Sequence, residues 1–190
     1  MNEVEIIRSQ LTAEQSHAAQ VANACAAVLG ASPGPSIGPS MPDETAALLR
    51  ESCVSYLVWV LARFEERDQT LSELLAARES ANGADAAAAR QLGALICRPG
   101  GSREALARLE SALASAEPDA ARSRWQEFAG FFNSAWISRR AALEGALARH
   151  LSVADWRAVC AIDADSILDE RTRFARIVAQ LPASIELRRP

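Results

Sequence analysis

Lysine is absent from the sequence: all 20 basic residues are arginine, against 24 acidic residues and 2 histidines. Without lysine, chemistry that needs an ε-amino group, such as Schiff-base formation, is excluded. The net charge of −4 disfavours binding to nucleic acid or to an anionic membrane surface. The arginines also form no basic stripe with interleaved aromatic residues. We therefore expect neither a nucleic acid nor a membrane as a partner.

Residues that favour β-strands are also scarce. The chain contains 1 tyrosine and few β-branched residues, whereas alanine occurs 40 times among its 190 residues. Because alanine loses no side-chain entropy in a helix, this composition favours helix over strand. We expect an all-α fold, an up-and-down four-helix bundle with a broken additional helical element. Residues 1–190 are expected to form a single domain, since a chain of this length can bury its own core.

Paired cysteines and targeting segments are missing as well. The 4 cysteines stand alone in separate segments, without the C-x-x-C spacing of zinc or redox sites: Cys25, Cys53, Cys97 and Cys160. We expect them to be small buried side chains in a reducing compartment. The amino terminus lacks the basic and apolar regions of a secretory signal, and the most apolar run, 54–62, is too short for a membrane span. These features predict a cytoplasmic location.

Apolar residues at spacings of three and four predict a first helix from Glu3 to Leu29, which Gly30 ends. The segment 30–42 contains 4 prolines and 3 glycines, so it is predicted to be a loop long enough to cross the end of a bundle. Asp43 can cap a second helix, which the pattern extends to about Ser80. Its strongly apolar face predicts a central position in the bundle.

The middle of the chain predicts a broken helical pair. One alanine-rich piece ends at Cys97 and another runs from Ser102 to Ala116, on either side of the helix-breaking residues 99–101. Pro118 suits the first turn of a helix and opens a run to His150 with an aromatic face. This helix carries 3 of the 5 phenylalanines of the chain, which predicts that it contributes much of the core.

A last helix is predicted from the neighbourhood of Ser152 to Leu181. Ser152 and Asp155 form a helix-start motif that resembles a capping box. Apolar residues continue at helical spacing from there without a glycine or proline, so the pattern predicts one unbroken helix. Pro182 ends it, and residues 183–190 are expected to form a loose or disordered tail.

Charged residues interrupt the apolar faces of three predicted helices. In the first helix Glu14 fills a position that the apolar series skips, and His17 lies one turn away on the same surface. Asp68 falls on the apolar face of the second helix, and Asp163 and Glu170 fall on that of the last helix. The sequence therefore gives five candidate metal ligands: Glu14, His17, Asp68, Asp163 and Glu170.

Two explanations account for these inward acids. A carboxylate in an apolar interior is costly unless it is paired, protonated or bound to a metal. The first explanation is a metal centre, with iron or another transition metal as the cofactor, since carboxylates and imidazole on facing helices suit such ions. The second is that the acids pair with inward arginines such as Arg139, Arg140 or Arg171, or lie at helix ends where the face reaches water. The sequence leaves both open.

A family resemblance lies in the stretch 136–178. This stretch contains a leucine-serine turn followed by an Asp-Trp pair, formed by Leu151, Ser152, Asp155 and Trp156. It resembles the carboxy-terminal half of hemerythrin-like (HHE) bundle proteins, and the resemblance implies a bundle of that architecture. That family binds a di-iron centre through H-x-x-x-E patterns. Val21 stands four residues after His17, and Ala154 stands four after His150. No family ligand can therefore be assigned, and we expect the di-iron site not to be intact.

Catalytic motifs are absent from the sequence, including the P-loop, the dinucleotide-binding glycine motif, the nucleophile elbow and the H-E-x-x-H zinc motif. We expect no catalytic residue and favour a non-enzymatic protein with a binding or assembly role, as a homo-oligomer or with a protein partner. Two alternatives stay open. One is an iron-binding bundle with an oxygen-handling or redox role. The other is a small-ligand sensor with a pocket in the bundle core beside Trp136.

Overall fold

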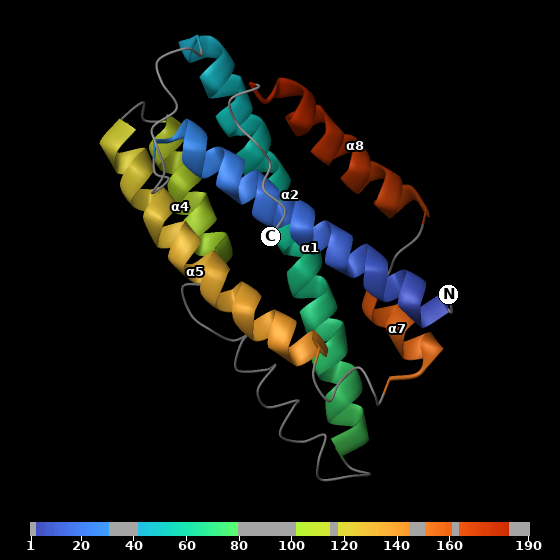
Figure 1. Cartoon of the computed structure of the whole chain (residues 1–190). Coiled ribbons are helices and arrows are strands. Elements are labelled where there is room, and N and C mark those ends of the chain that lie inside the picture. Colours follow the sequence, from blue (N-terminus) through green and yellow to red (C-terminus); the bar gives the residue numbers. More distant parts are fainter. Residues whose placement is uncertain are drawn as a thin grey trace.

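Six α-helices and no strand make up the part of the chain that the structure, a computed structural model, describes (Figure 1). That part comprises residues 3–30, 42–79, 102–114, 118–144, 151–160 and 164–182. The helices are α1 (Glu3–Val28), α2 (Asp43–Glu79), α4 (Ser102–Ala114), α5 (Pro118–Glu144), α7 (Val153–Cys160) and α8 (Ala164–Gln180). The all-α fold class predicted from the sequence is confirmed for these residues.

Helices α1 and α2 match their predicted bounds and run antiparallel. Gly30 follows α1 with a φ of 64°, a left-handed conformation that glycine adopts without a steric penalty. Cys25 near the carboxyl end of α1 meets Cys53 near the start of α2. Further along, Glu14 of α1 meets Arg67 of α2. Residues early in one helix therefore face residues late in the other.

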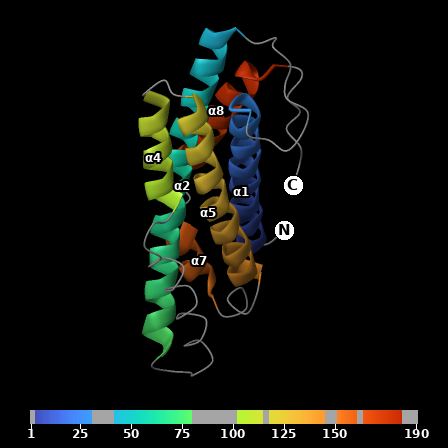
Figure 2. The same ribbon diagram turned by 90° about the vertical axis from the view of Figure 1, so that its left-hand side faces the viewer.

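The core lies mainly between α1, α2, α4 and α5, and Figure 2 shows α1, α2 and α5 extended along the same long direction. Large side chains that are fully buried there include Tyr56, Leu57, Leu106, Leu109 and Phe128. In α2 the buried positions recur every three or four residues, as the helical period requires for one face. Burying each such side chain contributes about 1.5–3 kcal/mol. Helix α2 contacts α1, α4, α7 and α8, which agrees with the central position that its apolar pattern predicted.

The predicted burial of the thiols is confirmed where the structure describes them. Cys25, Cys53 and Cys160 are free and buried. Cys25 and Cys53 share a hydrogen bond across the interface of α1 and α2, and this contact together with burial raises the pKa of the Cys25 thiol. Buried neutral thiols of this kind pack as small apolar groups. Cys97 lies outside the described residues.

The single last helix predicted up to Leu181 is wrong, because the structure has two helices there, α7 and α8. Figure 1 shows them with different directions, both lying against α1. The carbonyl oxygen of Cys160, at the end of α7, accepts a hydrogen bond from Nε of Arg67 at 3.4 Å. The last carbonyls of a helix need such outside partners. The apolar spacing continues through the break without a glycine or proline, so periodicity could not show it.

Several predictions fall on other parts of the chain. Residues 31–41 of the predicted loop, the alanine-rich piece that ends at Cys97, and the tail 183–190 lie outside the described residues. The second piece of the broken pair is confirmed as α4, which ends two residues before the predicted Ala116. Helix α5 begins at Pro118 as predicted, and 145–150 again lie outside the description. The single-domain assignment stays a prediction.

One stretch of α2 is long and apolar enough to cross a membrane by length and composition. It runs from Asp43 to Arg67, and 39% of its most apolar window is buried inside the protein. The central helix of a soluble protein can meet the same two criteria. In this chain the stretch contributes core residues such as Leu49, Leu57 and Phe64. Length and composition therefore do not decide where the protein resides.

Candidate functional site

Helix α1 carries two of the predicted site residues on one face. Glu14 and His17 are three residues apart, so their side chains leave the helix about one turn from each other. Glu14 is 3% exposed, whereas the His17 side chain is 24% exposed. The prediction that this face carries a charged side chain at core depth is confirmed by Glu14. Its neighbours decide whether that charge is structural or functional.

Two arginines of α2 neutralise Glu14. Nη1 of Arg67 lies 2.5 Å from Oε2 of Glu14, and Nη2 of Arg63 lies 3.4 Å from Oε1. The Arg67 side chain is only 5% exposed and stacks over the ring of Phe64, with 5.9 Å to the ring centroid. Two permanent cations can compensate the charge of a buried carboxylate without a metal. The arginine explanation therefore holds for Glu14, with partners other than those predicted.

This pairing leaves positive charge and donors in excess. Arg63 and Arg67 supply two positive charges against the single negative charge of Glu14. Nε of Arg63 and Nη2 of Arg67 are both buried, and neither has a hydrogen-bond partner. Buried donors without partners are uncommon because each costs the lost hydration of a polar group. The Glu14 end of the site is therefore electropositive.

Glu170 of α8 is the second buried carboxylate, and it has different partners. The hydroxyl of Tyr56 donates to Oε1 of Glu170 at 2.7 Å. Nδ1 of His17 lies 2.9 Å from the same oxygen, and the His17 ring stacks on Phe174 with 3.8 Å between ring centroids. A carboxylate oxygen can only accept, so Nδ1 of His17 carries the hydrogen of this bond whenever Glu170 is ionised. These contacts fasten α8 to both α1 and α2.

The surroundings of Glu170 change the pKa of Tyr56. Burial raises the pKa of Tyr56 far above its usual range, and the adjacent charge and hydrogen bond of Glu170 raise it further. The raised pKa favours the phenol as a neutral hydrogen-bond donor in the folded protein. A tyrosine in this state serves as a hydrogen-bond partner and not as a base or nucleophile.

We name these six residues the polar cluster: Glu14, His17, Tyr56, Arg63, Arg67 and Glu170. Three of them, Glu14, His17 and Glu170, belong to the predicted metal set. The side chain of Asp68 and the whole of Asp163 lie outside the described residues. Where the structure describes the chain, it nowhere gathers three His, Cys, Asp or Glu side chains that could hold a metal ion. The described candidates thus fit an ion-pair network better than a metal centre, and the five-residue site stays a prediction.

Sequence reasoning missed the partners of the two acids. It proposed Arg139, Arg140 and Arg171, but Arg171 is exposed, and the other two side chains are outside the description. Arg67 continues a buried series of α2 in which residues 53, 57, 60 and 64 precede it at helical spacing. That series could have identified Arg67 as an inward arginine. Tyr56 carried no such signal, because its hydroxyl needs a partner that only the packing of α8 supplies.

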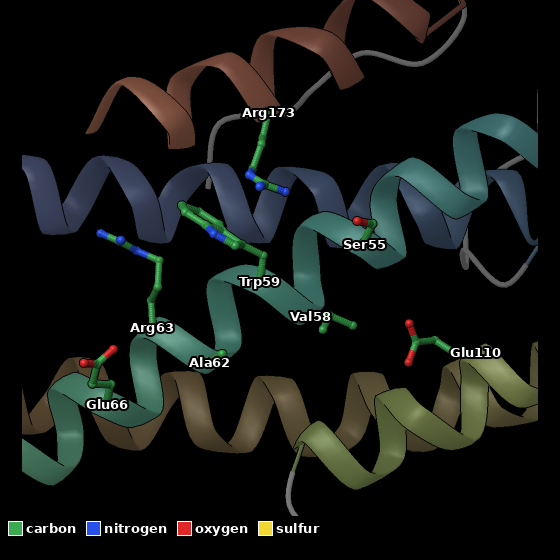
Figure 3. Close-up of a pocket in the computed structure, with 8 residues that line it drawn as sticks. All are labelled: Ser55, Val58, Trp59, Ala62, Arg63, Glu66, Glu110 and Arg173. Atoms are coloured by element: carbon green, nitrogen blue, oxygen red, sulfur yellow. The ribbon is translucent and has the colours of Figure 1, made fainter. Parts of the chain in front are cut away.

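An open groove lies along α2 beside the polar cluster, with a volume of about 500 Å³ (Figure 3). Residues of α2 form most of its surface: Ser55, Val58, Trp59, Ala62, Arg63 and Glu66. Glu110 of α4 and Arg173 of α8 complete it. This volume is in the usual range for small-molecule sites. We name this feature the α2 groove.

Trp59 is the centre of one wall of the α2 groove. The guanidinium carbon of Arg63 lies 4.9 Å from the indole centroid, and that of Arg173 lies 5.0 Å from it. Cation–π contacts at such distances are attractive and orient the guanidiniums. Figure 3 shows both arginines converging on Trp59, with Val58 next to Glu110 and Ala62 next to Glu66 along α2. Arg63 thus belongs to both the polar cluster and the groove.

A smaller hollow of about 190 Å³ continues from the groove between α2 and α8. The two spaces share Ser55 and Arg173, and the smaller one reaches Tyr56. The interface that α8 forms with α2 is therefore incompletely packed on its outer side. The pocket predicted beside Trp136 concerns a side chain outside the described residues and stays untested.

The helix start on which the family resemblance rests is present at α7. The backbone N–H of Ser152 donates to Oδ2 of Asp155 at 2.7 Å, and the N–H of Asp155 donates to Oγ of Ser152 at 3.2 Å. This reciprocal pair is the geometry of a capping box. It accounts for a helix start and carries no information about iron. The chain matches no protein-family model, and neither a curated protein nor a solved structure is significantly similar to it.

Proposed function

We propose that this chain is a non-enzymatic binding protein, an up-and-down helical bundle of hemerythrin-like architecture without an intact di-iron site. Its binding site in this proposal is the α2 groove. The polar cluster has a structural role, which is to fix α8 and α2 in the positions that form the groove. The protein would act by holding a ligand and not by transforming it.

The observation that carries this proposal is the position of Arg63. Its Nη2 lies 3.4 Å from buried Glu14, while its guanidinium carbon lies 4.9 Å from the Trp59 ring in the open groove. The buried ion pair therefore holds a cation and an indole ready on an accessible surface. Binding sites gain affinity when their groups are held in place before the ligand arrives. This is the expected arrangement for a binding surface supported from within.

Binding can be tested by saturation-transfer NMR with three simple probes: benzoate, benzylamine and phenylalanine. They represent an anion, a cation and a zwitterion, each with a ring that can pack on the apolar surface of the groove. We expect at least one probe to give a signal with the wild-type protein. The matched variants are Ala62→Phe, which fills the groove, and Ala77→Phe, which adds the same ring at an exposed position of α2.

The groove is supported as the binding site if Ala62→Phe loses the signal and Ala77→Phe keeps it. Urea unfolding of both variants shows whether each is folded as stably as the wild type. The proposal is overturned if no probe interacts with the wild-type protein. It is equally overturned if folded Ala62→Phe binds the probes as well as the wild type does.

A further inference from the structure

The charges of the α2 groove are divided between its two sides. Arg63 and Arg173 lie by Trp59 on the side next to α8, whereas Glu110 reaches in from α4 (Figure 3). Glu66 lies next to Arg63 at the end of the groove away from Glu110. A groove with cations on one side and anions on the other has a dipolar field across it. That field, more than any single charge, determines which ligands fit.

The cationic side keeps unused capacity. Arg63 shares Glu14 with Arg67, so two guanidiniums face one carboxylate, and the Arg63 guanidinium also lies against Trp59 in the groove. Nε of Arg173 is bonded to Asp169 at 3.0 Å, which leaves the outer nitrogens of its guanidinium for another acceptor. Guanidiniums bind carboxylates through paired N–H groups. This side of the groove therefore suits a carboxylate.

The anionic side is also available. Within the described part of the chain no ion pair joins the carboxylate of Glu66 or that of Glu110 to an arginine or a histidine. Both residues are exposed, and they lie at opposite ends of the groove, Glu66 beyond Ala62 and Glu110 beyond Val58. An ammonium group beside Glu110 would compensate that carboxylate. Val58 lies between Glu110 and the Trp59 wall, and its apolar surface suits a ring or a short hydrocarbon.

We propose that the α2 groove binds a small zwitterion whose ammonium and carboxylate stand at opposite ends of an apolar body the size of one ring. This inference rests on the groove being the binding site of the protein. The carboxylate lies against Arg63 and Arg173, and the ammonium lies against Glu110. The apolar body covers Val58. Aromatic amino carboxylates and short peptides belong to this chemical class.

Calorimetric titration with three matched probes tests the inference. Para-(aminomethyl)benzoate carries both charges, para-methylbenzoate keeps only the carboxylate, and the methyl ester of para-(aminomethyl)benzoate keeps only the ammonium. We expect the zwitterion to bind at least about fivefold more tightly than either singly charged probe, since each end meets an opposite charge at a half-exposed site. Raising the salt concentration should reduce this advantage.

The variant Glu110→Gln separates the two ends of the ligand. It removes one anion from α4 without touching the polar cluster. The affinity for the zwitterion should therefore fall about threefold or more, while para-methylbenzoate should bind at least as tightly as before. Equal affinity of the zwitterion and para-methylbenzoate for the wild type would overturn the zwitterion inference and leave the groove as an anion site. Failure of all three probes to bind the wild type would overturn the proposed function as well.

Discussion

The two buried carboxylates, Glu14 and Glu170, are equally inaccessible, with side chains 4% exposed, yet they are stabilised in opposite ways. Glu14 is held by two permanent cations, Arg63 and Arg67. Glu170 is held by a phenol and an imidazole. The first pairing is between elements adjacent in the sequence, α1 and α2. The second brings in α8 from the carboxyl end of the chain.

This difference separates two functions within one polar cluster. Arginine stays charged at every accessible pH, so the Glu14 end is a fixed electrostatic joint between α1 and α2. The Glu170 end depends on donors that are neutral or titratable, and it attaches the helix that supplies one arginine of the α2 groove. Breaking the first joint should destabilise the whole fold. Breaking the second should mainly loosen α8.

The largest effect is expected from Arg67→Met. The substitution keeps most of the side-chain volume but leaves Glu14 with only the longer contact to Arg63, and it strips the Cys160 carbonyl of its donor. Removing one partner of a buried ion pair costs about 3–5 kcal/mol of the free energy of unfolding. Urea denaturation measures this loss.

The matched control is Arg171→Met, the same replacement on the exposed side of α8. It should change the free energy of unfolding by no more than about 0.5 kcal/mol. Arg67→Lys should recover part of the loss, because it keeps the charge but not the planar donor group. Equal stability of Arg67→Met and Arg171→Met would show that the ion pair of Arg67 with Glu14 does not stabilise the fold.

A smaller effect is expected from Tyr56→Phe, which removes one donor to Glu170 and leaves only His17. Losing one of the two buried hydrogen bonds to this carboxyl oxygen costs about 1–3 kcal/mol. Because α8 is fastened at this point, amide hydrogen exchange in α8 should accelerate more than exchange in α1 or α4. Uniform acceleration over all helices would contradict a local role for the Glu170 end.

Alkaline pH offers a test without a mutation, because Tyr56 is the only tyrosine of the chain. Its pKa is raised in the folded protein, so the unfolded chain releases the phenol proton first as the pH rises. Stability from this group is complete below the usual tyrosine pKa of about 10 and falls by at most about 1.4 kcal/mol per pH unit above it.

The tyrosinate absorbance reports this transition directly. We expect it to appear only together with the loss of helical circular dichroism, since the folded protein holds the phenol neutral. The buried Cys25 thiol also has a raised pKa and adds to the alkaline loss, so Tyr56→Phe should reduce the pH dependence without abolishing it. Ordinary tyrosinate titration in a fully helical protein would contradict the burial of Tyr56.

The smallest effect concerns the surface pairing between α4 and α5. Arg108 donates to Glu127 at 2.7 Å, and Arg124 donates to its other oxygen at 3.0 Å, which lowers the pKa of Glu127. A lowered pKa stabilises the fold above the usual glutamate range, and this contribution is lost as the pH falls through the folded value. Arg108→Gln should raise the Glu127 pKa in a carboxyl NMR titration with little change in stability.

Much of the fold could be predicted from the sequence, because helix formation and helix ends depend on local residues. The alanine content indicated the fold class, Gly30 the end of α1, and Pro118 the start of α5. The break between α7 and α8 could not be predicted from periodicity, and the side chain that bonds the end of α7 is Arg67, far away in the sequence. Local patterns do not contain such partners.

The candidate site was predicted in part for the same reason. Glu14 and Glu170 interrupt apolar series, so their inward position could be inferred from spacing alone, and the structure confirms that both are buried. The nature of their partners depends on how α1, α2 and α8 pack, which spacing does not determine. The α2 groove could not be predicted either, because it is formed by residues of three helices that are separate in the sequence.

The most direct test of the central claim is the stability of Glu14→Gln in a chelator and with added Fe²⁺ or Zn²⁺. If Glu14 is the anion of an ion-pair network, the variant loses about 3 kcal/mol or more in the chelator, because two guanidiniums lose their counter-charge. Added metal should leave the free energy of unfolding of both proteins unchanged. Two results together would contradict the ion-pair role of Glu14: added metal stabilises only the wild type, and in the chelator the variant is at least as stable as the wild type. Both are expected if the substitution removes a metal ligand.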